Sequence, residues 1–454
     1  MITAKAFAGK HYAVLGLARS GLATVEALLA SGARVTAWDL DEEARAKFLP
    51  GTGRWQHEVL TEGGPSTAYS GPPPRSGEEL EIADLDTADL SQFDSLVVSP
   101  GVPLNRLPLA QRAREAGLEI IGDIELFARA RPELPPHKVV GITGTNGKST
   151  TTALVHHILQ TAGVPSAMGG NIGLPILAQD PLPEGGVYVL ELSSYQIDLT
   201  QSLDCDVAVL LNITPDHLDR YDSFEAYVAS KARLFEMQTP VHWAVIGVDD
   251  PAARKVATDL GRLDMTRVSA PKKYKKQRDW PGLQGPHNAQ NVGAAIAAVG
   301  ELGVHSPTIE VSLRSYPGLP HRMERVAEKG GVLFVNDSKA TNATAAAPAL
   351  AAFDAVRWIL GGQAKSDNLD ECAPHFGHVR KAYTIGEAGE LFARLLRPHM
   401  KVAECGTLEA AVQSAAAEAE AGDVVLLSPA CASFDQFRDF EERGDRFREL
   451  VGAL

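Results

Sequence analysis

The chain has few cysteines, no long apolar run and no excess of positive charge. Its four cysteines, spread over 454 residues, lack Cys-x-x-Cys spacing. This argues against a disulfide framework or a zinc site and fits a reduced cytosolic protein with packing cysteines. No apolar run approaches the ~20 residues of a membrane span, and Met1–Lys5 leads into a predicted strand rather than a signal-peptide core. We therefore expect a cytoplasmic protein without a membrane partner.

The formal net charge of −14 limits the kinds of ligand that the protein can attract. A chain this acidic is not expected to bind nucleic acid in general, and any anionic substrate must be held by local positive groups. The basic run 271–276 could be a nucleic-acid patch, but a solvated loop is the better interpretation in so acidic a chain. We expect no nucleic-acid partner.

Length and composition predict several α/β domains. With 44% hydrophobic and 22% charged residues the chain is globular, and 454 residues exceed what one core normally supports. Proline-bearing joints at 131–137 and 316–321 divide it into three predicted domains, 1–134, 135–317 and 318–454. Strand-like runs alternate with helical stretches in each, which indicates Rossmann-like terminal domains and a central P-loop ATPase-like domain with a mainly parallel sheet. Residues 63–77, rich in Gly and Pro, predict a surface insertion.

A predicted triphosphate-binding loop lies deep inside the chain. Residues 141–150 read Gly-Ile-Thr-Gly-Thr-Asn-Gly-Lys-Ser-Thr, between an apolar strand and a helical stretch. Backbone N–H groups at the helix start would face the phosphates, Lys148 would add a charge, and Ser149 or Thr150 could reach Mg²⁺. The expected ATP contacts are Gly144, Thr145, Asn146, Gly147, Lys148, Ser149 and Thr150. A glycine-rich turn without a ligand is the alternative, because Ile142 replaces the first glycine of the general motif.

The first domain opens with a second nucleotide-like turn. A strand at 11–15 is followed by Gly16–Gly21 and a helix, and a strand at 33–39 ends in Asp39. Ala18 replaces the middle glycine that lets backbone approach a pyrophosphate, which weakens a dinucleotide interpretation. Nucleotide binding without redox chemistry fits better, and a purely structural turn is the alternative.

The central domain places polar residues after two further predicted strands. Glu191 ends the strand that begins at residue 187, where open parallel sheets bind ligands, so it is a candidate Mg²⁺ ligand. The strand at 207–211 is followed by a segment that concentrates carboxylates around His217, which favours metal or substrate contact over a helix-start role. Lys231 lies on a helical stretch, and by residue chemistry alone it is a solvent-facing lysine.

These motifs together resemble the Mur ligase family. Thr-Gly-Thr-Asn-Gly-Lys-Ser-Thr is the loop variant of Mur ligases and folylpolyglutamate synthetases, and the family's order and spacing extend to Glu191–Ser194, 212–220, Lys231 and 287–291. The resemblance implies that Lys231 is carbamylated and helps His217 to hold a second Mg²⁺, with Ser149 and Glu191 as ligands of the first. It also implies that Asn288 and Asn291 meet adenine and that Arg322 and Asp337 meet phosphates and ribose.

Three motifs in the third domain resemble the D-glutamate-adding members of the family: residues 336–342, 361–365 and 428–437. The arginine-bearing signature of diaminopimelate or lysine adders is not found. Lys365, Thr341 and Ser433 offer a cation and hydroxyls for a second carboxylate. Further substrate contacts implied by the resemblance are Arg19, Ser20, Asp39 and Asn171 for the uridine nucleotide, and Phe440.

The resemblance implies a three-domain monomer that joins UDP-N-acetylmuramoyl-L-alanine to D-glutamate with ATP and two Mg²⁺ ions. The first domain would bind the UDP substrate, the central domain ATP and the third domain the amino acid. An acyl phosphate would form, and the glutamate amine would displace its phosphate, with Lys148, His217, Lys231 and Lys339 as catalytic groups. Alternatives are another Mur-type amide ligase or a folylpolyglutamate synthetase. A nicotinamide oxidoreductase or a nucleotide-gated binding module would rest on Gly16–Gly21 alone.

Overall fold

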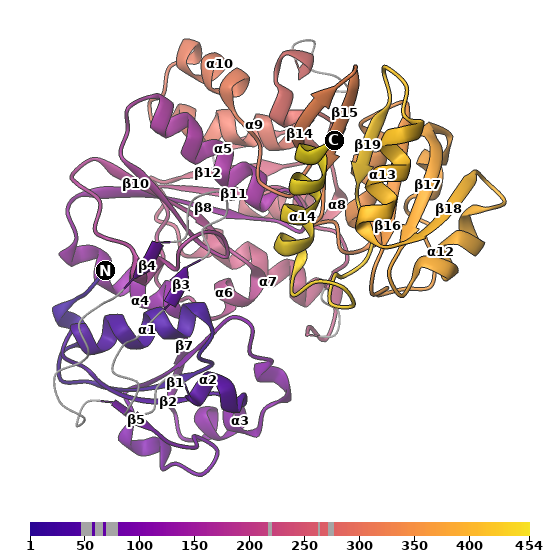
Figure 1. Ribbon diagram of the computed structural model, residues 1–454. Coiled ribbons are helices and arrows are strands. Elements are labelled where there is room, and N and C mark those ends of the chain that lie inside the picture. Colours follow the sequence, from indigo (N-terminus) through magenta and orange to yellow (C-terminus); the bar gives the residue numbers. More distant parts are fainter. Residues whose placement is uncertain (47–56, 60–66, 70–79, 217–219, 262–263, 271–276) are drawn as a thin grey trace. The chain divides into compact units, whose positions relative to one another are not determined.

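The computed structural model describes residues 1–46, 57–59, 67–69, 80–216, 220–261, 264–270 and 277–454 (Figure 1). His217, the basic run 271–276 and most of the predicted insertion at 63–77 lie outside the described residues. The chain forms two compact units, one of residues 1–269 with 293–309 and the other of residues 270–292 with 310–454. The two units are described separately below.

The first sheet of the first unit is fully parallel, in the order β5-β2-β1-β6-β7. Its strands are β1 (His11–Leu15), β2 (Arg34–Trp38), β5 (Leu80–Ile82), β6 (Ser95–Val98) and β7 (Glu119–Ile121). Its helices are α1 (Arg19–Ala30), α2 (Glu42–Ala46), α3 (Pro108–Glu115) and α4 (Asp123–Ala130). The order places the first strand in the middle and reverses beside it, which is the Rossmann-like arrangement.

The second sheet of this unit is also parallel, in the order β13-β12-β11-β8-β10-β9. Its strands are β8 (His137–Thr143), β9 (Ser166–Gly170), β10 (Gly186–Glu191), β11 (Val207–Leu210), β12 (Trp243–Gly247) and β13 (Met265–Val268). The helices α5 (Lys148–Thr161), α6 (Ser194–Asp198), α7 (Phe224–Glu236) and α8 (Pro251–Leu260) connect them. In Figure 1, α5 lies on one face of this sheet and α6 and α7 lie on the other.

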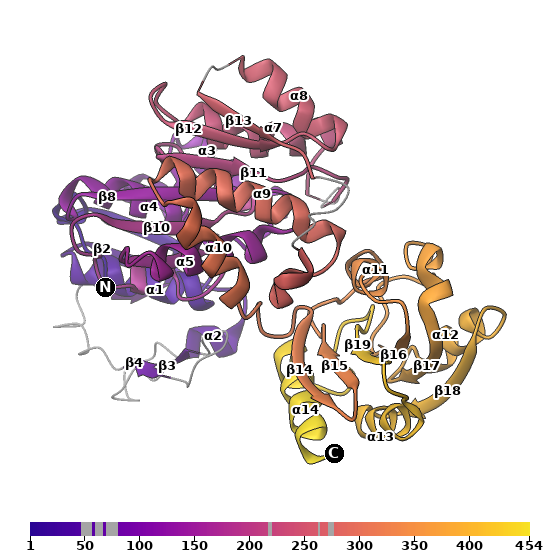
Figure 2. The ribbon, with the colours of Figure 1, turned by 90° about the horizontal axis from the view of Figure 1, so that it is seen from above.

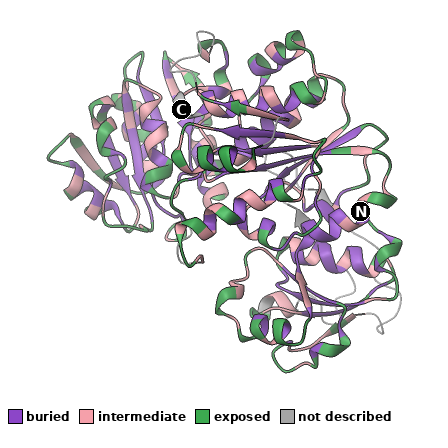
Figure 3. Cartoon of the chain, turned by 180° about the vertical axis from the view of Figure 1, so that it is seen from behind, coloured by how far each residue is buried: buried purple, intermediate pink, exposed green. Residues whose placement is uncertain are grey.

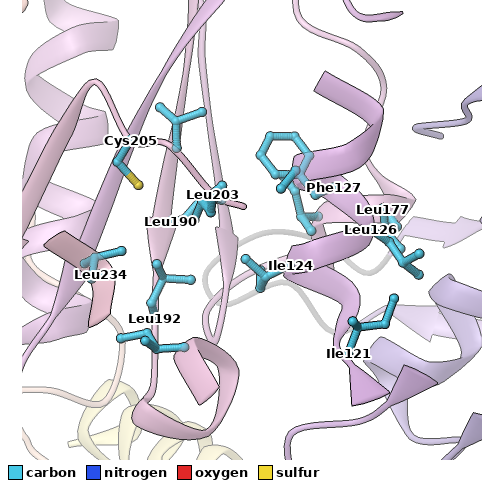
Figure 4. Packing of buried hydrophobic residues seen from close by; sticks show 14 of the residues in the cluster. Ile121, Ile124, Leu126, Phe127, Leu177, Leu190, Leu192, Leu203, Cys205 and Leu234 are labelled. Atoms are coloured by element: carbon cyan, nitrogen blue, oxygen red, sulfur yellow. The ribbon is translucent and has the colours of Figure 1, made fainter. Parts of the chain in front are cut away.

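One apolar cluster joins the two sheets of the first unit. It contains Tyr12 and Val35 of the first sheet, Phe127 of α4, and Tyr188 and Leu190 of the central sheet, all at most 1% exposed. Figure 4 shows part of it, with side chains from α4 and from the central sheet. Burial of apolar surface stabilises by about 25 cal/mol per Å². The shared cluster explains why residues 1–269 form one compact unit.

The second unit contains the third sheet, in the order β14-β15-β19-β16-β17-β18. Its strands are β14 (Glu324–Lys329), β15 (Val332–Asn336), β16 (Val356–Gly361), β17 (Val379–Ile385), β18 (Lys401–Gly406) and β19 (Val424–Leu427), and its helices are α11 (Ala343–Ala351), α12 (Gly389–Leu396), α13 (Leu408–Glu418) and α14 (Phe440–Ala453). Only β14 pairs antiparallel, at one edge. The predicted α/β fold with mainly parallel sheets is confirmed.

Both faces of the third sheet are buried, as the strand sequences require. Trp358 and Leu360 belong to one apolar cluster, whereas Ile359, between them, belongs to the other. In β19, Val424 belongs to the cluster of Trp358, and Val425 belongs to the cluster of Ile359. Successive strand residues point to opposite faces, so a continuously apolar strand needs helices on both sides. Figure 3 shows the resulting pattern of buried strands with exposed outer helix surfaces.

The remaining elements include two helices, α9 (Pro286–Glu301) and α10 (Ser306–Ser315), which Figure 2 shows from above. The others are the hairpin β3 (His57–Val59) and β4 (Thr67–Tyr69), and the 3-10 helices η1 (Lys5–Phe7), η2 (Leu90–Gln92), η3 (Leu104–Arg106), η4 (Arg131–Glu133), η5 (Ile176–Ala178), η6 (Gln277–Asp279), η7 (Pro281–Leu283) and η8 (Ala373–His378). Within the described residues, no helix is both long and apolar enough to cross a bilayer. The cysteines are free; Cys205, Cys372 and Cys431 are buried and Cys405 is half-buried.

The close approach of α1 to the turn after β1 requires a residue without a Cβ atom at Gly21, which a substitution can test. A Cβ at Gly21 would lie 1.8 Å from the carbonyl oxygen of Gly16. We therefore expect Gly21→Ala to lower the free energy of unfolding by roughly 1–3 kcal/mol, because backbone must move to admit the methyl group. Gly300→Ala in α9 is the control, since nothing lies within 4 Å of its Cβ position, and it should raise stability by up to about 1 kcal/mol. Urea unfolding measures both free energies of unfolding, and equal changes in the Gly21→Ala and Gly300→Ala variants would contradict this explanation.

Candidate functional site

The predicted phosphate loop connects β8 to α5, and its geometry depends on two glycines. Gly144 and Gly147 have φ angles of 154° and 86°, which L side chains rarely adopt. Asn212, just after β11, clamps the loop: its Oδ1 accepts from the Asn146 N–H at 2.9 Å and its Nδ2 donates to the Asn146 carbonyl at 3.1 Å. Gly147 caps α5 without a side-chain hydrogen bond, an arrangement typical of anion-binding helix starts.

Two lysine ammonium groups converge on the carbonyl oxygen of Gly144. Lys148 Nζ donates to it at 3.0 Å and to the Thr145 carbonyl at 2.9 Å, and Lys231 Nζ donates to it at 3.0 Å. Lys231 is 1% exposed, so the expectation of a solvent-facing lysine from residue chemistry alone is wrong. Burial, with the charge of Lys148 as a further cause, lowers the pKa of Lys231 to about 7. The loop therefore concentrates positive charge where a phosphate would lie.

Tyr227 joins these groups, and sequence reasoning missed it. Its hydroxyl lies 3.2 Å from Thr145 Oγ1, and its ring centroid lies 4.7 Å from Lys231 Nζ. The available signal was spacing, because Tyr227 precedes Lys231 by one turn of the same helical face. Two buried side chains of α7, Tyr227 and Lys231, thus link this helix to the predicted phosphate loop.

Glu191 ends β10 with one carboxylate oxygen unsatisfied. Oε1 accepts from Asn171 Nδ2 at 3.0 Å, whereas Oε2 is buried and has no hydrogen-bond partner among the residues that the structure describes. A buried carboxylate oxygen without a partner is unfavourable, and a cation would relieve it. Within the described part of the chain, no three His, Cys, Asp or Glu residues form a metal cluster. Mg²⁺ commonly uses one or two carboxylates with substrate phosphates, so Glu191 and the hydroxyl of Ser149 fit it.

The predicted uridine-nucleotide residues lie on the first sheet and a neighbouring turn. Asp39 closes the Gly16 turn: its Oδ2 accepts from the Leu17 N–H at 2.5 Å. Arg19 Nη2 donates to the Gly173 carbonyl at 2.9 Å, in the turn that carries Asn171. Ser20 lies half-exposed in the first turn of α1. The structure therefore brings Arg19 close to the Asn171 turn, and through Asn171 to Glu191.

A cleft of about 400 Å³ in the first unit contains none of the predicted site residues in its lining. Arg220 and the stacked rings of Tyr195 and Tyr221 form part of its wall. The Arg220 guanidinium lies 4.6 Å from the Tyr195 ring centroid and donates to the carbonyls of Gly101 and Val102. Arg220 thereby connects the central sheet to the loop after β6. Arg220 belongs to the segment 212–220, whose sequence pattern indicates a function only for its histidine and carboxylates.

Two of the predicted nucleotide residues of the second unit, Asn288 and Asn291, form a pair. Asn291 Nδ2 donates to Asn288 Oδ1 at 3.0 Å, and both amides are buried. Asp337 is buried at the end of β15, where Ser428 Oγ donates to it at 2.7 Å. Burial raises the pKa of Asp337 to about 7, opposed by that hydrogen bond and by the charge of Arg322.

The predicted amino-acid residues follow three neighbouring strands of the third sheet, β15, β19 and β16. Lys365 Nζ lies 3.5 Å from Thr341 Oγ1, and Lys339 Nζ lies 4.9 Å from the Phe440 ring centroid. Ser433 is 2% exposed. The loop after β16 pairs with the loop after β19 through two 2.9 Å hydrogen bonds between Gln363 and Ala432. The carboxyl edge of this sheet therefore gathers a cation and hydroxyls.

Two regions of the chain match known protein families. Residues 142–281 match the Mur ligase middle domain, and residues 321–431 match the family described as Mur ligase, glutamate ligase domain. The chain belongs to the Mur ligase family. As a Mur ligase, it is an ATP-dependent enzyme that forms amide bonds, and the predicted family resemblance is confirmed.

Relatives of this Mur ligase match over its whole length. Three relatives each align with 100% of this chain. They come from Novosphingobium aromaticivorans (59% identical, with 97% of the relative's length covered), Sphingopyxis alaskensis (57% identical, 100% covered) and Zymomonas mobilis (54% identical, 100% covered). All three are named UDP-N-acetylmuramoylalanine–D-glutamate ligase.

Solved structures of other Mur ligases share the fold. The chain resembles MurC from Thermotoga maritima with a TM-score of 0.57 at 16% identity, covering 98% of this chain and 99% of that one. It resembles MurF from Thermotoga maritima, solved in complex with ADP, with a TM-score of 0.57 at 17% identity, covering 98% and 96%. At these identities the likeness establishes the fold alone.

The unsatisfied oxygen of Glu191 leads to a prediction that separates function from stability. Glu191→Gln should leave the melting temperature unchanged or raise it, because a buried charge is removed. It should also abolish Mg²⁺-dependent ATP turnover or raise the Mg²⁺ concentration required by at least tenfold, because a neutral amide is a poor Mg²⁺ ligand. Thermal unfolding and a Mg²⁺ titration of phosphate release measure the two effects. Normal Mg²⁺ dependence in the variant would exclude Glu191 as a ligand.

Proposed function

We propose that the enzyme joins D-glutamate to UDP-N-acetylmuramoyl-L-alanine with hydrolysis of ATP to ADP and phosphate, in cytoplasmic synthesis of peptidoglycan precursors. The observation that carries the proposal is the name shared by relatives that are 54–59% identical over the whole chain. The gathering of Thr341, Lys365 and Ser433 at one sheet edge supports it, because D-glutamate brings a second carboxylate that needs a cation and hydroxyl donors.

The reaction would proceed in two steps that balance. A carboxylate oxygen of the UDP substrate attacks the γ-phosphorus of ATP, and ADP leaves as an acyl phosphate forms. The neutral amine of D-glutamate then attacks the acyl carbon, its nitrogen loses a proton to solvent, and the tetrahedral intermediate collapses to the amide with release of phosphate. Lys148 and Lys339 would offset phosphoryl charge, and His217 would orient the acyl phosphate. Positioning and charge neutralisation supply the catalysis.

We further propose that Ser149 and Glu191 hold one Mg²⁺ ion and that His217 and a carbamylated Lys231 hold a second. Bound Mg²⁺ would neutralise negative charge on the phosphate oxygens. The unsatisfied Oε2 of Glu191 supports the first site. The burial of Lys231, with its Nζ on the phosphate loop, supports the second.

The other predicted roles complete the proposal. The domains would be 1–134 for the UDP substrate, 135–317 for ATP and 318–454 for the amino acid. Arg19, Ser20, Asp39 and Asn171 would bind the uridine nucleotide, and Gly144–Thr150 the triphosphate. Asn288 and Asn291 would contact adenine, Arg322 and Asp337 the phosphates and ribose, and Phe440 the amino-acid substrate. We propose a cytoplasmic monomer with no nucleic-acid or membrane partner.

A substrate panel tests the proposed function. UDP-muramoyl acceptors and a folate acceptor are combined with D-glutamate, L-glutamate, lysine and diaminopimelate, and phosphate release is measured together with product mass. We expect product only from UDP-N-acetylmuramoyl-L-alanine and D-glutamate. Preference for L-glutamate on a folate acceptor would indicate a folylpolyglutamate synthetase. Binding of NAD(H) without product would indicate an oxidoreductase.

Removal of Lys231 tests the proposed carbamate. Lys231→Ala should lose activity, and added short carboxylic acids should restore part of it, because an exogenous carboxylate can take the place of the missing anion. Assays of the variant with and without acetate or formate measure this. Full activity without added acid, or an intact mass showing only a free amine in active parent enzyme, would refute the carbamate.

Removal of Lys365 tests the choice of amino acid. Lys365→Ala should raise the KM for D-glutamate by a factor corresponding to roughly 1.5–3 kcal/mol, the range for a charge-assisted hydrogen bond. Because Lys365 is exposed, we expect the lower end. The KM values for ATP and for the UDP substrate should change little. Lys401→Ala, at another exposed lysine of the second unit, is the matched control. An unchanged glutamate KM with weakened ATP binding would move Lys365 to the nucleotide site.

A further inference from the structure

Arg443, in the first turn of α14, is a fully buried cation bonded only to neutral groups. It is 1% exposed. Its Nε donates to Ser338 Oγ at 2.9 Å, its Nη2 donates to the carbonyls of Ser338 at 2.8 Å and Cys431 at 3.1 Å, and its Nη1 donates to the Ala432 carbonyl at 3.3 Å. One guanidinium therefore holds two loops that are far apart in the sequence.

The charge of Arg443 is not compensated by an ion pair. Among the residues that the structure describes, no carboxylate lies within 4.0 Å of its nitrogens. Asp435 exerts a longer-range attraction; its Oδ2 accepts from the Glu387 N–H at 3.0 Å, whereas its buried Oδ1 has no hydrogen-bond partner among the described residues. Burial lowers the pKa of Arg443 to about 10. An apolar side chain at this position would leave the acceptors of Arg443 without their donor, so the guanidinium fixes the loop atoms as well as carrying a charge.

The loops that Arg443 holds carry the proposed amino-acid residues. Ser338 directly precedes Lys339 and the loop to Thr341, and Cys431 and Ala432 directly precede Ser433. The contact extends to a third segment, because Ser338 Oγ also donates to the Phe440 carbonyl at 2.8 Å. Every one of these segments lies in the second unit.

We propose that Arg443 is a positioning residue for the amino-acid substrate, which sets the spacing between the loop after β15 and the loop after β19. This inference rests on the proposed function. Arg443 acts through the backbone of these loops and does not touch the substrate. It is buried beneath residues that must meet a small dicarboxylic amino acid, where a shift of about 1 Å is enough to reduce catalysis strongly.

The geometry requires the guanidinium and not only its charge. Arginine presents five donors in a planar fork, and Arg443 uses all three of its nitrogens. Lysine would keep the charge but has one nitrogen on a flexible stem, so it cannot reach both loops with the same fixed spacing. The Arg443→Lys variant therefore separates the contribution of the positive charge from that of the guanidinium's hydrogen-bond geometry.

The test compares Arg443→Lys and Arg443→Met with Arg446→Met in the purified full-length enzyme. Arg446 lies on the same helix, 42% exposed, and its ion pairs with Glu409 and Glu449 are on the surface. We expect both Arg443 variants to raise the KM for D-glutamate at least tenfold, with less than a threefold change in the KM for the UDP substrate. Arg446→Met should match the parent in all constants.

Two results would overturn the proposal. One is a glutamate KM within twofold of the parent in Arg443→Lys; the other is an equal rise in the KM of the UDP substrate, which a general loss of structure would produce. If the Arg443 variants do not fold, the Ser338→Ala variant tests the proposal instead. It removes the hydroxyl that accepts from Arg443 Nε and donates to the Phe440 carbonyl, and it changes no charge. It should raise the glutamate KM at least threefold, and an unchanged KM would refute the proposal. Failure of the proposed function is distinguishable, because the parent enzyme would then form no product with D-glutamate.

Discussion

The structure depends on the burial of both faces of each parallel sheet. Strand β19 is apolar at every position and β16 at every position but Arg357, and their alternate apolar side chains enter separate cores on opposite faces. Helices must therefore cover both sides, which leaves the carboxyl edges of the strands to carry polar loops. The predicted phosphate loop follows β8, Glu191 ends β10, and the loops proposed to bind the amino acid follow β15, β16 and β19. The site residues lie at these edges because the sheet faces are already occupied.

At these edges the protein retains buried polar groups that stability alone would not favour. Lys148 and Lys231 share one carbonyl oxygen, and among the described residues Glu191 Oε2 lacks a hydrogen-bond partner and Arg443 has only neutral acceptors. Lys148 and Arg443 bring local positive charge and Glu191 brings local negative charge, although the whole chain has a net charge of −14.

Much of the fold was predictable because its signals are local. The apolar strands, the glycine turns after β1 and β8, and the order of motifs predicted parallel α/β sheets and a Mur ligase. The antiparallel strand β14 was not anticipated, because pairing direction depends on where the chain returns and not on composition. The environment of Lys231 was also misjudged from residue type, since a lysine on a helix is ordinarily exposed and only the packing of α7 against the phosphate loop buries it.

The class of chemistry could be predicted from the sequence alone. The phosphate loop, the carboxylate at a strand end and the family's motifs are each recognisable in a short contiguous segment, without the structure. The tertiary structure alone decided which side chains act together. Tyr227 bridges the phosphate loop and Lys231, Asn212 clamps Asn146, and Arg443 holds loops more than ninety residues apart in the sequence. Such contacts join distant segments, and no local pattern encodes them, because they arise only when the sheets align their carboxyl edges.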